Sequence, residues 1–143
     1  ALTFSDPAMV QFFKDGLKEM IGDGVDLLFC NEEEAMLFAD ADNLEDAIKF
    51  MRTQAKTFAI TLGSKGAIAF DGETTHVIEA NEVTAVDSNG AGDLFAGAFM
   101  YAITHGHDFA AAGRLASAAS AQVVSQFGPR LDAQQHAPLK DVL

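Results

Sequence analysis

Two short apolar runs, separated by helix-forming sequence, constrain the fold of this chain most. Val25 to Cys30 (VDLLFC) and Thr57 to Leu62 (TFAITL) are nearly continuous apolar segments of strand length. Such runs are expected for strands that are covered on both faces of a parallel sheet. Helical patterns precede the first run and lie between the two. The alternation of strands and helices predicts an α/β layered sheet.

The spacing of apolar residues predicts three helices in the first part of the chain. Asp6 is a candidate N-cap with Pro7 at the first helical position, and Gly22 is a plausible end. The apolar positions that recur at helical spacing are Val10, Phe13, Leu17 and Met20. A second, short helix is expected to begin at Asn31, and a third follows Asn43.

A β-hairpin and two long helices are predicted in the second part. Asp71 and Gly72 separate the run Ala67 to Phe70 from THVIEA, which is a strong hairpin signal. One helix follows the segment DSNGAGD and repeats its apolar residues with a 3.6-residue period. The next begins near Asp108, is rich in Ala, and is expected to end at Gly128. The sequence LDAQQHAPLKDVL is expected to be a polar tail.

Composition excludes some partners. The net charge of −12, from 21 acidic and 9 basic residues, disfavours nucleic acid and anionic membrane surfaces, because both require Lys and Arg. The single cysteine, Cys30, has no partner for an internal disulfide and is predicted to be a buried strand thiol, which fits a reducing, cytoplasmic compartment. No membrane span is expected, since no uninterrupted apolar stretch of about 18 residues occurs. A chain of 143 residues predicts one compact domain.

The glycine loop from Gly90 to Asp93 is the strongest candidate for a chemical site. Gly90 and Gly92 allow the backbone to approach a ligand closely, and the helix start presents unpaired N–H groups and the positive end of the helix dipole. In the same turn, Asp93 could accept or orient the proton of a hydroxyl that attacks a bound phosphoryl group. The same residues also fit an ordinary helix start, with glycine for geometry and Asp for the dipole.

Two other phosphate-binding motifs fit less well. GxxxxGK followed by Ser or Thr is absent, so a P-loop ATPase is not predicted. Gly97 comes two positions too late after Gly90 and Gly92 to complete GxGxxG. A nonenzymatic nucleotide-binding or dinucleotide-binding module stays an alternative.

The segment VDSNGAGDLFAGAF resembles the second signature of the ribokinase-like, or PfkB-type, carbohydrate and nucleoside kinases. By this resemblance, Gly90, Ala91 and Gly92 form an anion hole that stabilises the transferring phosphoryl group, and Asp93 is the catalytic base. The resemblance implies an α/β fold, a three-layer sheet with helices on both faces and one β-hairpin. Residues 1–143 would be its C-terminal, nucleotide-binding and catalytic part, with the N-terminal half and its lid absent.

Two further stretches resemble family elements in order and spacing. NEEE resembles the NxxE element that organises magnesium and phosphate, which makes Asn31 and Glu34 the matching pair. The same pair fits a helix capping box. TLGSKG resembles the nucleotide loop, so the resemblance places Thr61, Gly63 and Gly66 near the ATP phosphates or ribose. Without the resemblance, TLGSKG is an ordinary glycine turn.

The late helix LASAASAQVVSQFG resembles the family helix that borders the adenine base, with Ser117 and Gly128 as the matched positions. Some members also bind a monovalent cation such as K⁺ beside the anion hole. Asp87 and the carbonyl group of Asn89 would correspond to its ligands, and this site is left open.

The resemblance implies a kinase that uses ATP and Mg²⁺ to phosphorylate a hydroxyl group of a small-molecule nucleoside or sugar. Adenosine is the favoured acceptor, because Asn before GAGD and the FGPRL ending look more like nucleoside kinases. Ribose and fructose are the alternatives. The expected protein partners are the missing N-terminal half and, as an open alternative, a second copy in a homodimer.

Overall fold

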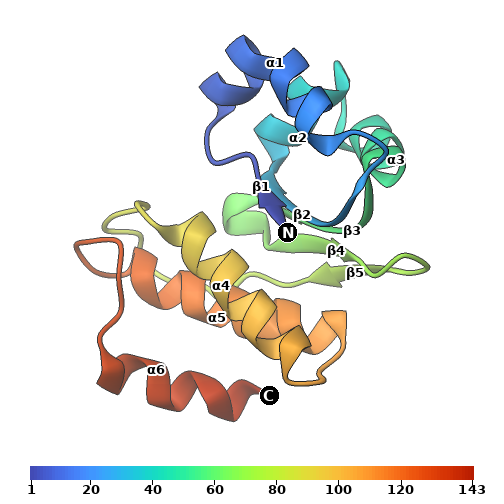
Figure 1. The fold of residues 1–143 in the computed structure, drawn as a ribbon. Coiled ribbons are helices and arrows are strands. Elements are labelled where there is room, and N and C mark those ends of the chain that lie inside the picture. The colour runs from blue at the N-terminus through green and yellow to red at the C-terminus, as the bar shows by residue number, and fades with distance from the viewer. The chain divides into compact units, whose positions relative to one another are not determined.

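The computed structural model describes all 143 residues, and they divide into two compact units. The first unit contains residues 1–62 and 70–75, and the second contains residues 63–69 and 76–143. The strands, in their order across one sheet, are β1 (Leu2–Thr3), β2 (Val25–Asn31), β3 (Ala55–Thr61), β4 (Ala67–Phe70) and β5 (Thr75–Ile78). Figure 1 labels these elements. The α/β class predicted from the sequence is confirmed.

The first unit is built on parallel strands. β1 pairs with β2 and β2 pairs with β3, both in parallel, with Leu28 opposite Phe58 and Asn31 opposite Thr61. The connecting helices are α1 (Pro7–Ile21), α2 (Glu32–Ala39) and α3 (Leu44–Gln54), seen in Figure 1. Cys30 is buried, as the sequence predicts. The largest fully buried side chains of this core are those of Phe4, Phe38, Phe58, Leu28, Met51, Ile60 and Val10.

Helix α1 begins and ends as predicted, and it buries Val10 and Leu17 as expected but not Phe13 and Met20. Asp6 caps it by accepting a 2.6 Å hydrogen bond from the Ala8 amide, and Gly22 is its C-cap. Phe13 and Met20, however, are 61% and 65% exposed. The buried residues are Val10, Leu17 and Ile21. Positions 13 and 20 lie beside the buried face of α1 and not on it. The backbone at position 13 also leaves helical geometry (φ −124°, ψ 25°).

The hairpin prediction is confirmed. β4 and β5 are neighbours joined by residues 71–74. The Asp71 carboxylate accepts hydrogen bonds from the Glu73 and Thr74 amides at 2.9 and 2.7 Å. Gly72 adopts φ 102°, a conformation that side chains rarely tolerate.

The second unit pairs α4 (Ala91–Thr104) with α5 (Phe109–Val124), which lie side by side in Figure 1. The Ser120 hydroxyl of α5 donates a 3.0 Å hydrogen bond to the Ala91 carbonyl of α4. The small residues of α5 have a packing role. A Cβ on Gly113 would lie 2.5 Å from the Ile78 side chain, so only glycine allows α5 to approach β5 this closely.

The end of the chain differs from the expectation. α5 ends at Val124, four residues before Gly128. Residues 131–143, expected to be a polar tail, contain α6 (Ala133–Leu139), followed by a short 3-10 turn at Lys140–Val142. A capping box explains α6, because the side chain of Asp132 accepts the Gln135 amide and Gln135 reaches back to the Asp132 amide. None of the helices has the length and apolar character needed to span a lipid bilayer.

Candidate functional site

The start of α4 is the one α-helix start in the chain without a side-chain cap. An Asp or Asn side chain caps each of the other five α-helices. At α4 the N-cap is Gly90, which has no side chain to offer. The first-turn amides of Gly92 and Asp93 therefore lack such an acceptor, and together with the helix dipole they favour a negatively charged ligand.

Gly90 and Gly92 are needed for different reasons. Gly90 adopts φ 77°, and a Cβ there would lie 2.5 Å from the Pro129 carbonyl oxygen. This glycine therefore lets the loop after α5 pack against the start of α4. A Cβ on Gly92 would meet nothing within 4 Å, so Gly92 faces open space. No side chain or backbone segment therefore blocks the approach of a ligand to Gly92.

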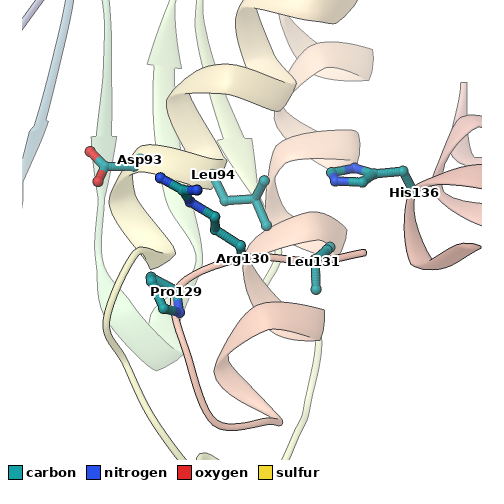
Figure 2. A pocket seen from close by; sticks show the side chains of 6 residues that line it. All are labelled: Asp93, Leu94, Pro129, Arg130, Leu131 and His136. Atoms are coloured by element: carbon teal, nitrogen blue, oxygen red, sulfur yellow. The ribbon is translucent and has the colours of Figure 1, made fainter. Parts of the chain in front are cut away.

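The side chain of Asp93 is exposed and lines a cavity. This cavity has a volume of about 440 Å³. Figure 2 shows its lining residues, which are Asp93, Leu94, Pro129, Arg130, Leu131 and His136. The carboxylate of Asp93 is thus exposed to solvent, in the same turn as the amides that lack a side-chain acceptor. Its role as a proton acceptor stays a prediction.

Asp87 joins the loop before α4 to the loop after α5. Its Oδ1 accepts a 3.0 Å hydrogen bond from the Asn89 amide, and its Oδ2 accepts a 3.1 Å bond from the Gly128 amide. These two N–H donors lower the pKa of the Asp87 carboxyl group, because they stabilise its charged form. Oδ1 therefore stabilises the loop before α4, and Oδ2 links that loop to the loop after α5. The role of Asp87 as a cation ligand stays a prediction.

Asn31 and Glu34 form the capping box that the sequence allowed. The Asn31 side chain accepts the Glu34 amide, and Glu34 Oε2 accepts the Asn31 amide, both at 2.8 Å. Glu34 is only 4% exposed, and burial raises the pKa of its carboxyl group, against the opposing effect of the bond from Asn31. The box uses Oε2 alone, which leaves Oε1 without a role in the cap.

The predicted nucleotide loop begins where β3 ends. Thr61 is the last residue of β3 and lies opposite Asn31 in the register. Gly63 opens a 3-10 turn (Gly63–Lys65) with φ 61°. Gly66 has φ 98°, and a Cβ there would lie only 2.0 Å from the Ile78 carbonyl oxygen. Packing against the end of β5 is therefore sufficient to require glycine at position 66.

Ser117, predicted to border an adenine base, has its hydroxyl engaged within the chain. It donates to the Glu79 carbonyl and accepts from the Asn81 side chain, both at 3.0 Å. Its observed contacts hold residues 79–81 against α5. The predicted contact of Ser117 with a nucleotide is untested.

The predicted site residues fall into two groups. Within the first unit, Asn31, Glu34 and Thr61 gather at the carboxyl ends of β2 and β3. Within the second unit, the loop that contains Asp87, the glycine loop 90–93 and Gly128 meet at the start of α4. Sequence reasoning gave no role to Arg130 or His136, which line the cavity with Asp93. The FGPRL ending supported a nucleoside acceptor, but nothing in the sequence pattern distinguished its arginine as a site residue.

Comparison with known proteins gives consistent matches over most of the chain. Residues 1–136 match the pfkB family carbohydrate kinases. A ribokinase of Lactococcus lactis subsp. lactis is 38% identical over 110 residues, which cover 77% of this chain and 35% of the ribokinase. An adenosine kinase structure from Sinorhizobium meliloti is similar with a TM-score of 0.92 and 26% identity, over 99% of this chain and 44% of that chain.

A third match carries ligands. The structure of Arabidopsis thaliana ribokinase complexed with ribose and ATP is similar with a TM-score of 0.73 and 27% identity. The match covers 85% of this chain and 42% of that chain. The chain thus spans between 35% and 44% of the length of these relatives.

Proposed function

Because this chain belongs to the pfkB family of carbohydrate kinases, we propose that it is the nucleotide-binding and catalytic part of an ATP-dependent kinase. The kinase transfers the γ-phosphoryl group of ATP to a hydroxyl group of a nucleoside or sugar. The observation that carries the proposal is the uncapped start of α4 with the exposed carboxylate of Asp93 in its first turn.

In this proposal the glycine loop stabilises charge and Asp93 handles the proton. The acceptor oxygen bonds to the γ-phosphorus while the bond to the bridging oxygen of ADP breaks. The Asp93 carboxylate orients the attacking hydroxyl and accepts its proton. The amides of Gly92 and Asp93 donate to the phosphoryl oxygens, where negative charge is concentrated during transfer.

Mg²⁺ fits the donor chemistry of the first unit. Glu34 offers a carboxylate oxygen that the capping box does not use, and Mg²⁺ in kinases is held by one or two carboxylates plus waters and phosphate oxygens. No three or more His, Cys, Asp or Glu side chains of the chain group together as a ready-made metal site. This agrees with a metal that arrives bound to ATP. When bound, it neutralises the charge of the phosphates.

Adenosine is our first choice of acceptor, and ribose or fructose is the alternative. The support for a nucleoside is the Asn89-Gly90 step and the FGPRL ending in the sequence. The support for a sugar is the greater identity to a ribokinase. Beyond the small-molecule substrates, we propose that the protein partners are an N-terminal half carrying the lid or a second copy of the chain.

The decisive experiment replaces Asp93 by Asn in the full-length protein and assays ATP-dependent phosphorylation across a panel of nucleosides and sugars. Loss of the proton acceptor should lower kcat by about 10² to 10⁴-fold with ATP binding retained. The matched control is Asp141→Asn, which changes an exposed Asp that does not line the cavity and should keep full activity. Wild-type protein that binds ATP and phosphorylates no acceptor would support a nonenzymatic binding module instead.

A further inference from the structure

The cavity beside Asp93 contains a charged group that the proposed mechanism does not use. Of the six lining residues, Arg130 is the only Lys or Arg. In Figure 2 its guanidinium group extends from the loop after α5 toward the first turn of α4, where Asp93 lies. A cavity of about 440 Å³ is within the size range of small-molecule sites.

The guanidinium group of Arg130 has no ion-pair partner in the chain. All four salt bridges lie in the first unit and use Lys14, Lys49 and Lys56. Arg130 and Asp93 line the same cavity without forming a salt bridge. The side chain is therefore available to an anion that enters from solvent.

The backbone that carries Arg130 is fixed, although its side chain is exposed. The Gly128 amide bonds to Asp87, and Pro129 packs against Gly90. The carbonyl oxygen of Arg130 accepts a 3.0 Å hydrogen bond from the Gln126 side chain. The next residue, Leu131, is buried. Because this backbone is held, binding of an anion has to order only the side chain of Arg130.

We propose that Arg130 is a further catalytic residue, which binds the transferring phosphoryl group beside the first turn of α4, the turn that carries Asp93. A guanidinium group presents a planar fork of N–H donors that matches two phosphate oxygens and does not lose its proton. It therefore stabilises charge on the phosphoryl group without competing with Asp93 for the hydroxyl proton. This inference rests on the proposed kinase function.

The positive charge of Arg130 also offsets a repulsion within the proposed site. Asp93 is a carboxylate placed next to an anionic phosphoryl group, in a chain with a net charge of −12. The two negative charges repel each other unless a cation lies nearby. Arg130 supplies that cation from the second unit itself.

The test uses Arg130→Ala and Arg130→Lys in the full-length protein, with kcat and the KM for ATP and acceptor measured separately. Removing the guanidinium should lower kcat by about 10²-fold, because its effect is greatest in the transition state. The melting temperature should stay unchanged, since the side chain makes no contact that the fold requires. Added guanidinium ion should restore part of the activity of Arg130→Ala, and Arg130→Lys should retain an intermediate kcat.

The matched control is Arg114→Ala, an exposed arginine on α5 that does not line the cavity, and it should keep wild-type kcat. A kcat for Arg130→Ala within about threefold of wild type would overturn the inference. So would a loss that Arg114→Ala shares, or a loss that guanidinium ion does not relieve. In each case an inactive Asp93→Asn would leave the kinase function standing. Only wild-type protein without ATP-dependent phosphorylation would remove both.

Discussion

At the scale of single residues, the sequence could not decide between two roles of Glu34, a helix cap and a magnesium ligand. Asn followed three residues later by Glu is the signature of a helix capping box and also matches the family element associated with magnesium. The structure confirms the capping box. It also adds what the sequence could not supply, namely the burial of Glu34 to 4% exposure and the raised pKa of its carboxyl group.

We predict that Glu34→Gln preserves the fold and impairs catalysis. Gln at this position keeps the capping box, since its side-chain oxygen accepts the Asn31 amide in the same way. Phosphoryl transfer should fall at least about tenfold, because the amide is a poorer Mg²⁺ ligand than a carboxylate. The control is Glu33→Gln, which changes the exposed neighbour. Unchanged kcat in Glu34→Gln would mean that Glu34 is a cap alone.

The raised pKa of Glu34 gives a second measurement on the same variant. A carboxyl group whose pKa is higher in the folded state favours folding while it is protonated, and this contribution is lost as pH rises through the folded-state pKa. At neutral pH the ionised Glu34 therefore costs stability. Glu34→Gln should have an equal or higher melting temperature at pH 7. A thermal-melt series should show less loss of stability between acid and neutral pH than in wild type.

At the scale of elements, the sequence predicted best those segments whose local pattern and tertiary packing agree. β2 and β3 contain nearly continuous apolar runs, and Asp71-Gly72 is a strong turn signal, so both predictions are confirmed. α1 was harder, because it carries apolar residues on two faces, and periodicity cannot tell which face is buried. α6 was missed because its residues are polar and its signal, Asp132 with Gln135, is short.

The glycines at the start of α4 provide a prediction at this scale. Gly90→Ala should destabilise the second unit, because its Cβ would clash with the Pro129 backbone and the residue has a left-handed conformation. Gly92→Ala has open space and helical geometry, and alanine favours a helix over glycine by up to about 1 kcal/mol. Chemical denaturation should therefore show a loss of stability for Gly90→Ala and none for Gly92→Ala.

Gly92→Ala should test the site itself, because it is expected to change kcat without lowering stability. An added methyl group would occupy the open space at Gly92, which we propose the phosphoryl group approaches, so Gly92→Ala should lower kcat in spite of its intact fold. A stable, fully active Gly92→Ala protein would contradict an anion hole at this loop. The sequence predicted the loop but could not distinguish these two glycines, because the Pro129 contact joins residues far apart in the chain.

At the scale of the whole molecule, one face of α1 is left without cover. Met9, Phe12, Phe13 and Met20 are 43%, 74%, 61% and 65% exposed. Their spacing places them on one side of the helix, with Gly16 among them. Contiguous exposed apolar side chains of this size promote association in water.

We predict that the 143-residue chain expressed alone self-associates through this face. Sedimentation should show association that depends on concentration, and a dye that binds apolar surfaces should bind to it. The variant Phe12→Gln/Phe13→Gln/Met20→Gln should reduce both signals with little change in stability, because these side chains are largely exposed. The control is Val77→Gln, another exposed apolar residue but on β5. Association that the triple variant leaves intact would contradict this prediction.

The missing cap of α4 has a further consequence for the molecule. Side chains of the chain itself cap the other five α-helices, whereas the first turn of α4 has no side-chain acceptor. In the proposed function, a bound phosphate group accepts these hydrogen bonds. An anion that binds there binds the folded chain and not the unfolded one, so the free energy of unfolding rises with the occupancy of the site. The protein would then be most stable when its substrate is bound and least stable when the site is empty.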